Sequence, residues 1–315
     1  MENQELTVIV WCLTYNQKVF IKDALDGFIM QQTTFPIEVV VHDDASTDGT
    51  TDIVMEYARK YPDIIKPVVE KENQWQKGGL KHIIQIMNKN HRRGRYIAFC
   101  EGDDYWTDPH KLQKQVDFLE NHPDYSMCFH SAKKKYETDT IAWINCEHIQ
   151  DKDYDATDVF VNWTVPTASV VCRKEAMDFY ANLKNPERIQ NYDIFIILSC
   201  ATVGKIRGMH EQMSVYRIQG GGLTYNKEAL IRCTMNNPEH FMCLKENFPI
   251  VDSSPVNETI SKTLFERALI QYSIKAQFMD FASSLRYNTP IFLRMTMKYL
   301  LKKSIASFSK LVRRS

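Results

Sequence analysis

The sequence predicts an α/β fold with a doubly wound, mostly parallel sheet and flanking helices, followed by a helical C-terminal region. Strand-like and helix-like segments alternate over about the first 120 residues, and the pattern becomes helical from about residue 226. Alternating strands and helices are typical of a parallel sheet covered by helices. We therefore expect two domains, residues 1–225 and residues 226–315.

The strands are predicted from short apolar runs, rich in β-branched residues, that lie between polar turns. The first run is apolar almost throughout, which is typical of a central parallel strand covered on both faces. In chain order, the expected strands cover residues 6–13, 37–41, 64–69, 96–100, 143–146, 165–172 and 213–218.

The helices are predicted from apolar residues that recur every three or four positions. The first expected helix has one apolar face, formed by Ile21, Ala24, Leu25, Phe28 and Ile29. A helix is expected after Asp108 and Pro109, which would supply its N-cap and the proline of its first turn. Further helices are expected over residues 53–61, 80–90 and 191–202.

Composition and charge exclude several classes of protein. Hydrophobic residues make up 44% of the chain and charged residues 25%, which argues against disorder, collagen-like repeats and a coiled coil. Lys+Arg and Asp+Glu both number 39, whereas a dedicated nucleic-acid binder is normally basic. The N-terminus is acidic, no CxxC pair occurs, and no run reaches the ~18 apolar residues of a membrane span. We expect a cytoplasmic protein with free thiols.

Polar clusters follow three of the predicted strands, and ligands of doubly wound sheets bind at the carboxyl ends of the strands. The three clusters are Thr14-Tyr15-Asn16, Asp43-Asp44 and Glu101-Gly102-Asp103-Asp104. Three carboxylates within four residues repel one another unless a cation lies between them, and a divalent cation prefers oxygen ligands. The alternative is a solvated acidic turn at the start of the next helix.

The Asp43-Asp44 pair suggests a second kind of contact, because a carboxylate can accept a hydrogen bond from the ring N–H of a base such as uracil. A turn rich in capping residues is the alternative interpretation. Neither GxGxxG nor GxxxxGK[ST] occurs in the chain. Their absence argues against dinucleotide oxidoreductases and P-loop NTPases.

Taken in order, several segments resemble the family 2 glycosyltransferases, which have the GT-A fold, and within them the bacterial enzymes of surface-polysaccharide assembly. The resemblance covers about residues 5–225. The segments that carry it are VIVWCLTYN, VVVHDDASTDGT, YIAFCEGDDYW, NYDIFI and VYRIQGGG.

This resemblance implies an inverting enzyme that moves a sugar from a nucleotide-sugar, a UDP-sugar by preference, to a saccharide or polyprenyl-linked acceptor, with Mn²⁺ or Mg²⁺ as cofactor. Asp44 matches the aspartate that contacts uracil. Asp103 and Asp104 match the metal and diphosphate or ribose ligands, and Glu101 stands in place of the first aspartate of the DxD motif. The remaining nucleotide-binding candidates are Thr14, Tyr15, Asn16 and Arg217.

By the same resemblance Asp193 is the catalytic base. Tyr192 stands where the family usually has glutamate, and Gln219 where relatives often have histidine. Asp193 has an alternative role of its own, because an aspartate at the start of a helix is favourable as a cap or as a charge near the positive end of the dipole.

Two other functions compete with glycosyl transfer. A sugar nucleotidyltransferase usually has a glycine-rich loop with Arg or Lys after its first strand, and Thr14-Tyr15-Asn16 does not supply one. A non-catalytic sugar-nucleotide binding module would not need Asp193 together with the acid cluster. Hydrolysis of a UDP-sugar, measured with and without Mn²⁺, would separate the glycosyltransferase from the binding module.

The C-terminal tail has a charge pattern of its own. Eight basic residues and no acid follow Asp280, so residues 1–280 carry a net charge of −8. Residues 291–312 predict a basic amphipathic helix, which suits an anionic membrane surface at the inner face of the cell membrane. The alternative is a helix packed on the acidic body.

Overall fold

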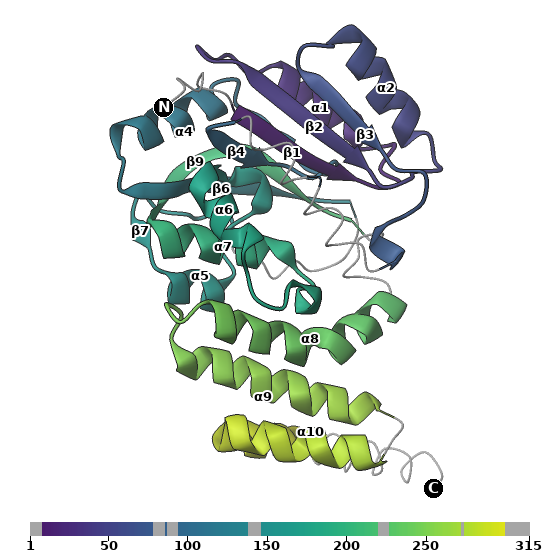
Figure 1. The fold of residues 1–315 in the computed structure, drawn as a ribbon, viewed down its shortest axis with the longest axis vertical. Coiled ribbons are helices and arrows are strands. Elements are labelled where there is room, and N and C mark those ends of the chain that lie inside the picture. Colours follow the sequence, from purple (N-terminus) through teal and green to yellow (C-terminus); the bar gives the residue numbers. More distant parts are fainter. Residues whose placement is uncertain are drawn as a thin grey trace, which may run out of the picture. The chain divides into compact units, whose positions relative to one another are not determined.

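The computed structural model of the chain describes residues 8–77, 86, 94–137, 146–219, 227–271 and 274–299. The chain divides into two compact units, which are described one at a time. Unit 1 comprises residues 1–187 and 191–220, and unit 2 comprises residues 188–190 and 221–315. Figure 1 shows the sheet with its helices in unit 1 and the helices of unit 2.

Unit 1 is built on one mixed sheet, which has nine strands within the described residues and the order β3-β2-β1-β4-β8-β6-β9-β5, with β7 paired to β9. β1 pairs in parallel with β2 and β4, and β2 with β3, whereas β8 is antiparallel to β4 and β6. The strands are β1 (Val8–Thr14), β2 (Ile37–Asp43), β3 (Ile65–Val69), β4 (Tyr96–Phe99), β5 (Tyr105–Trp106), β6 (Tyr125–Tyr136), β7 (Asp153–Tyr154), β8 (Val171–Arg173) and β9 (Lys205–Ile218).

The helices of unit 1 are amphipathic or buried, and they cover this sheet. They are α1 (Ile21–Ile29), α2 (Thr50–Lys60), α4 (Lys111–Asn121), α5 (Ala156–Asn162), α6 (Lys174–Ala181) and α7 (Tyr192–Val203). Short 3-10 helices are η1 (Trp75–Lys77), η2 (Thr167–Ser169) and η3 (Pro186–Arg188). Most of the helix expected over residues 80–90, and residues 143–145 of an expected strand, lie outside the described residues.

The register of the sheet brings the polar clusters to one edge. Val8, Val10 and Cys12 of β1 are completely buried in the core that the inner face of α1 also enters. Thr14 at the end of β1 lies beside Asp43 at the end of β2, and β4 runs parallel to β1 on its other side. The residues after β1, β2 and β4 therefore meet at the carboxyl edge of the sheet.

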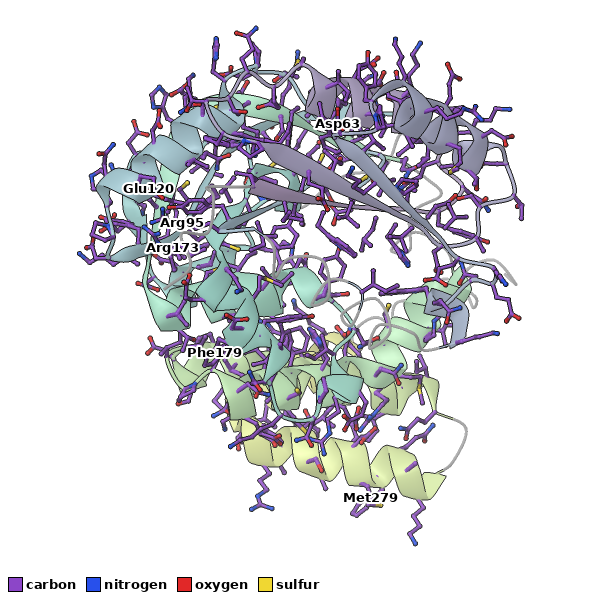
Figure 2. The ribbon with its side chains drawn as sticks, turned by 45° about the horizontal axis from the view of Figure 1, so that its top comes forward. Asp63, Arg95, Glu120, Arg173, Phe179 and Met279 are labelled. Atoms are coloured by element: carbon purple, nitrogen blue, oxygen red, sulfur yellow. The ribbon has the colours of Figure 1, made fainter. Side chains whose placement is uncertain are left out.

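Arg173 of β8 connects three elements near the middle of the sheet. Its Nε donates to the carbonyl oxygen of Tyr125 at 2.7 Å, and its Nη1 donates to Tyr96 Oη at 3.1 Å. Arg95, just before β4, forms an ion pair with Glu120 of α4 at 3.1 Å. Figure 2 labels Arg95, Glu120 and Arg173, which gather at one side of the sheet.

The predicted α/β fold class is confirmed, and two local predictions are wrong. The strand expected over residues 165–172 is interrupted by η2, so β8 begins only at Val171. The helix expected from Pro109 begins at Lys111, because Asp108 Oδ1 accepts a hydrogen bond of 2.7 Å from the amide of His110 and holds a separate turn there.

Unit 2 is helical, as the C-terminal pattern predicted. It contains α8 (Lys227–Asn247), α9 (Ser253–Ile270) and α10 (Ile274–Tyr287), followed by helical backbone over residues 289–299. α9 packs against both α8 and α10. Among the described residues, no helix combines the length and the apolar character that crossing a membrane requires.

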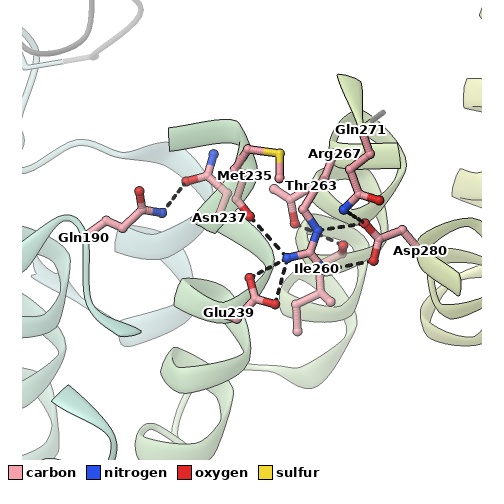
Figure 3. A network of polar contacts seen from close by, with 9 residues as sticks. All are labelled: Gln190, Met235, Asn237, Glu239, Ile260, Thr263, Arg267, Gln271 and Asp280. Carbon is pink, nitrogen blue, oxygen red and sulfur yellow. Dashed lines mark hydrogen bonds and ion pairs between the residues drawn. The ribbon is translucent and has the colours of Figure 1, made fainter. Parts of the chain in front are cut away.

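One guanidinium joins three helices of unit 2, as Figure 3 shows. Arg267 of α9 donates from Nε and Nη2 to the two carboxylate oxygens of Asp280 on α10, at 2.7 and 2.8 Å. Its Nη1 donates to both carboxylate oxygens of Glu239 on α8, at 2.7 and 2.6 Å. Such bidentate contacts fix geometry as well as charge, so Arg267 sets how α8, α9 and α10 pack.

Candidate active site

The acid turn that follows β4 is anchored to the end of β1. The amide of Gly102 donates to the carbonyl oxygen of Leu13 at 2.8 Å. A Cβ atom on Gly102 would lie 2.6 Å from Gln17 Oε1 and 2.8 Å from Thr14 Oγ1. Because such contacts are too close for any side chain, only glycine lets the turn pack this tightly against β1.

The carboxylates of this turn lie in an environment that disfavours their charged forms. Burial raises the pKa of Glu101 to about 7, and the charge of Asp103 adds to the effect. Burial also raises the pKa of Asp103, and it raises that of Asp104 well above the usual range, with help from the other two carboxylates. Such a buried cluster is short of positive charge, which a bound cation would supply.

The end of β9 supplies hydrogen-bond donors to the same turn. The backbone amide of Arg217 donates to Asp104 Oδ1 at 2.7 Å. The side-chain amide of Gln219 donates to Asp103 Oδ2 at 2.6 Å. Both aspartates therefore have one carboxylate oxygen that accepts from β9 or from the residue that follows it.

The guanidinium of Arg217 is enclosed by protein groups, and its side chain is 1% exposed. It forms ion pairs with Asp23 at 2.7 Å and with Glu137 at 3.2 Å. It also lies between the rings of Phe20 and Tyr105, 4.6 and 5.0 Å from their centroids. A role of Arg217 at a diphosphate stays a prediction, and it requires an exchange of these partners.

The first turn of α7 reaches the acid turn through Tyr192. Its hydroxyl donates a hydrogen bond of 2.6 Å to Glu101 Oε1. Asp193, the next residue, is close enough for its charge to raise the pKa of Glu101. The structure therefore brings Asp193 and the acid turn together, although 91 residues separate Tyr192 from Glu101 in the sequence.

Asp193 lies in the first turn of α7, in an environment that disfavours its charged form. Its Oδ1 accepts a hydrogen bond of 2.8 Å from the amide of the next residue, Ile194, whereas the N-cap position of α7 belongs to Asn191. Burial raises its pKa. It also lines a small pocket whose other walls are Val159, Trp163, Thr164, Val165, Ile194 and Ile197.

Asp44 follows β2 and is 6% exposed. Its Oδ1 and Oδ2 accept hydrogen bonds from the amides of Gln74 and Trp75, at 2.6 and 3.1 Å, so the carboxylate caps η1. Each carboxylate oxygen can accept a second hydrogen bond. The contact between Asp44 and uracil stays a prediction.

The turn after β1 is tied to the loop after β2. The amide of Asn16 donates to Ser46 Oγ at 2.9 Å, and Asn16 Oδ1 accepts from the amide of Thr47 at 2.8 Å. The carbonyl oxygen of Thr14 accepts from the amide of Asp44 at 3.0 Å. Tyr15 is 40% exposed. Thr14 and Asn16 thus hold the two loops together, whereas the ring of Tyr15 is accessible to a ligand.

Several residues around the site were not expected from the sequence. Asp23 in the first turn of α1 resembles an ordinary favourable charge at a helix start, and Glu137 follows a lysine-rich strand end. Nothing local indicates that both hold Arg217. The same is true of Tyr180, whose buried hydroxyl has no hydrogen-bond partner in the described part of the chain and whose pKa the charge of Asp193 helps to raise.

The carboxylate oxygens of the acid turn fit a hard divalent cation that is coordinated by the protein and by a substrate phosphate. Among the described residues, no three His, Cys, Asp or Glu side chains converge as a complete metal cage. Mg²⁺ is commonly held by one or two carboxylates together with substrate phosphates and water. Asp103 and Asp104 would supply those carboxylates.

An acidic turn at the carboxyl edge of a mixed α/β sheet is the arrangement of the GT-A fold. The sequence profile of the family described as Glycosyl transferase family 2 matches residues 9–178. The chain belongs to this family, which confirms the family predicted from the sequence segments.

Two relatives differ in how much of their own length the chain covers. An uncharacterised protein of Mycobacterium bovis is 35% identical over 221 residues, which cover 68% of this chain and 59% of that protein. The chain therefore matches well under two thirds of that relative's length. TuaG of Bacillus subtilis, provisionally named a teichuronic acid biosynthesis glycosyltransferase, is 27% identical over 72% of this chain and 85% of its own length.

Two solved structures share the fold. TarS residues 1–349 of S. aureus, in complex with UDP-GlcNAc, align with a TM-score of 0.61 at 16% identity, over 90% of this chain and 80% of that one. The mannosyltransferase PcManGT of Pyrobaculum calidifontis, in complex with GDP-Man and Mn²⁺, aligns with a TM-score of 0.53 at 19% identity, over 95% and 86%. At identities this low, the two alignments show a common fold and nothing more. The expected GT-A fold is therefore confirmed.

Proposed function

We propose that this protein is an inverting glycosyltransferase that moves a sugar from a nucleotide-sugar to a saccharide or lipid-linked saccharide acceptor in polysaccharide biosynthesis. The hydrogen bond between Tyr192 and Glu101 carries the proposal, because it sets Asp193 beside the acid turn. A base next to a diphosphate-binding turn is what glycosyl transfer requires. The name of the relative TuaG supports a role in cell-surface polysaccharide.

A UDP-sugar is the proposed donor. Asp44 and the accessible ring of Tyr15 lie on neighbouring loops at the edge of the sheet, where a base could pair with one and stack on the other. A relative of the same fold binds UDP-GlcNAc, which supports uracil, and another binds GDP-Man, so the fold alone does not decide the base.

A divalent cation is the proposed cofactor, Mn²⁺ or Mg²⁺, with Asp103 and Asp104 as its protein ligands. When bound, it would supply Lewis-acid stabilisation of the diphosphate that leaves. The neighbour PcManGT with Mn²⁺ supports a metal of this kind. The chain's own contribution is to hold the two aspartates by the Arg217 amide and the Gln219 side chain.

Asp193 is the proposed general base. It accepts the proton of an acceptor hydroxyl, whose oxygen then forms a bond to the anomeric carbon from the face opposite the diphosphate. The bond between that carbon and the diphosphate oxygen breaks, and the electron pair leaves with the diphosphate. Burial raises the pKa of Asp193, which makes its carboxylate a stronger base than an exposed aspartate.

We further propose that the protein acts in the cytoplasm, at the inner face of the cell membrane, through its basic tail. In the part of the tail that the structure describes, Leu293 and Met297 are 55% and 64% exposed, and Arg294 and Lys298 are exposed beside them. Residues 300–312 of the predicted amphipathic helix lie outside the described residues. A polyprenyl-linked acceptor would be presented at such a surface.

The test is a panel of nucleotide-sugars, with and without Mn²⁺, in which release of the nucleoside diphosphate is measured. We expect release from one UDP-sugar, dependent on the metal and lost in Asp193→Asn. If a nucleotide-sugar binds tightly but none is turned over with any acceptor, the chain is a binding module. Release of pyrophosphate from a sugar 1-phosphate and a nucleoside triphosphate would instead indicate a nucleotidyltransferase.

A further inference from the structure

The outer face of unit 2 has an unusual composition. We use this name for the exposed residues of α10 and of the helical segment after it. Four of these twelve residues are basic, five are large and apolar, and none is acidic. They are Lys275, Phe278, Met279, Ala282, Leu285, Arg286, Thr289, Pro290, Leu293, Arg294, Met297 and Lys298.

The inner side of α10 contains polar contacts as well as Phe281, whose ring packs against Phe265 of α9. Asp280 pairs with Arg267, and Ser284 Oγ donates to the carbonyl oxygen of Ser261 at 2.7 Å. On the outer face, Phe278 and Met279 are 73% and 58% exposed. In Figure 2 the side chain of Met279 extends from the side of α10 that faces away from α9. The outer face of a surface helix is usually polar.

This mixture of apolar and basic side chains indicates what kind of partner surface would bind the outer face. Large apolar residues favour a surface that excludes water, whereas the basic residues between them favour one with negative charge. An isologous contact with a second copy would set this basic face against itself, which like-charge repulsion disfavours. An anionic bilayer meets both requirements, because apolar side chains are buried at its acyl boundary and its headgroups attract the basic side chains.

We propose that the outer face of unit 2 docks on an anionic lipid surface, with Phe278 and Met279 entering the interface and Lys275 and Arg286 on the headgroups. This rests on the membrane role proposed above for the tail, and it extends that role to α10, which the tail does not include. Several weak signals acting together are what stable membrane attachment requires. The outer face thus extends the proposed lipid contact from the described part of the tail to α10.

The experiment is co-sedimentation of the full chain with vesicles of phosphatidylglycerol and phosphatidylcholine, compared with phosphatidylcholine alone. Phe278→Ser with Met279→Ser should lower partitioning by about tenfold or more, since two large side chains no longer enter the interface. The matched control is Ile231→Ser with Ile250→Ser, which removes two apolar side chains of 46% and 41% exposure outside this face. It should bind as the wild type does.

A charge series separates α10 from the tail. Replacing both Lys275 and Arg286 with Gln should weaken binding to the anionic vesicles by about thirtyfold, at about 1 kcal/mol per basic residue, and high salt should also weaken the binding of the wild type. A second variant replaces the tail cations outside the described residues with Gln, at Lys302, Lys303, Lys310, Arg313 and Arg314.

The outcomes are distinguishable. If only the tail variant loses binding, the role of α10 is overturned and that of the tail is kept. If the wild type ignores anionic vesicles at low salt, both are overturned. If the wild type dimerises and Phe278→Ser with Met279→Ser abolishes the dimer, the face binds a second copy instead. Nucleoside diphosphate release should be unchanged in every variant, so the proposed chemistry is tested separately.

Discussion

The hydroxyl of Tyr192 donates a hydrogen bond of 2.6 Å to Glu101 Oε1, and it joins the start of α7 to the acid turn after β4. Burial and the charge of Glu101 raise the pKa of Tyr192 well above its ordinary value, so its hydroxyl keeps its proton and stays a donor. Asp193 follows directly in the chain. The position of the proposed base therefore depends on a contact with the proposed diphosphate-binding turn.

Tyr192→Phe tests this dependence. Without the hydroxyl the first turn of α7 loses its link to Glu101, and a misplaced base costs about 10- to 100-fold in kcat. We expect kcat to fall while the KM of the donor changes little. Tyr57→Phe is a matched control, because the Tyr57 hydroxyl on α2 likewise donates to a carboxylate, that of Asp26, outside the site. An unchanged kcat in Tyr192→Phe would show that the contact is only structural.

Asp193→Asn tests the base. Asparagine keeps the size and can still accept from the amide of Ile194, but it does not take up a proton. We expect transfer to fall by about 10²–10⁴, while calorimetry shows unchanged binding of UDP. Burial raises the pKa of Asp193, so the carboxylate takes up its proton at a higher pH than an ordinary aspartate does. As the pH is lowered, wild-type kcat should therefore begin to fall before the usual titration range of aspartate is reached. Weak UDP binding with normal turnover at saturation would point to a structural role for Asp193 instead.

The metal prediction is sharpened by the different burial of the two aspartates. Asp103→Ala and Asp104→Ala should both abolish stimulation by Mn²⁺. Asp104 is 4% exposed and accepts from the backbone amide of Arg217, so Asp104→Ala leaves that amide unpaired and should also cost about 1–3 kcal/mol of stability. We expect the smaller loss of stability in Asp103→Ala. Asp52→Ala, which removes an exposed acid on α2, is the control. Normal Mn²⁺ dependence in both variants would remove the metal assignment.

The sequence predicts local structure well here and distant contacts poorly. β1, α1, β2 and α2 follow from hydrophobic periodicity, and the acid turn from the order of its residues. β6 was not expected from the sequence. Its second half contains Lys133, Lys134 and Lys135, and a run of lysines is not typical of a strand inside a sheet. The pairing of Arg217 with Asp23 joins residues 194 positions apart. Periodicity reports which face of an element is buried, but not which distant partner it meets.

Lys111 gives a test of stability against pH. Its side chain is completely buried, with Nζ 4.2 Å from the centre of the Trp106 ring and 2.8 Å from Gln115 Oε1. Burial lowers its pKa to about 7. An unfolded lysine keeps its proton up to about 10.4, so between these values the unfolded chain binds more protons. The free energy of unfolding should therefore rise with pH over this window.

Lys111→Met removes this titrating group while keeping an unbranched side chain. The measurement is urea unfolding at several pH values. The free energy of unfolding of the wild type should rise between neutral and alkaline pH, and that of the variant should not. The variant should therefore be most stable relative to the wild type near neutral pH. Lys60→Met, on the exposed side of α2, should keep the wild-type slope. Equal slopes in the wild type and Lys111→Met would mean that the buried ammonium stays charged in the folded protein.

Arg267 is expected to be the most sensitive single position of unit 2. Its side chain is 14% exposed and pairs with Asp280, itself 7% exposed, while Glu239 is 44% exposed and can be solvated. Arg267→Met leaves the Asp280 carboxylate buried without its bidentate partner. Removal of one member of a buried pair costs about 3–5 kcal/mol, so hydrogen exchange of α8, α9 and α10 should accelerate strongly.

The companion variant separates the charge from the packing. Arg267→Met with Asp280→Leu removes both buried charges, and it should recover much of the lost protection, because replacing a whole ion pair by apolar groups is often neutral or stabilising. Arg294→Met removes an exposed cation of the same unit and should change nothing. All five tryptophans precede residue 188, so tryptophan fluorescence reports only unit 1. If the double variant is as unstable as Arg267→Met, the contacts of Arg267 with α8 outweigh its pair with Asp280.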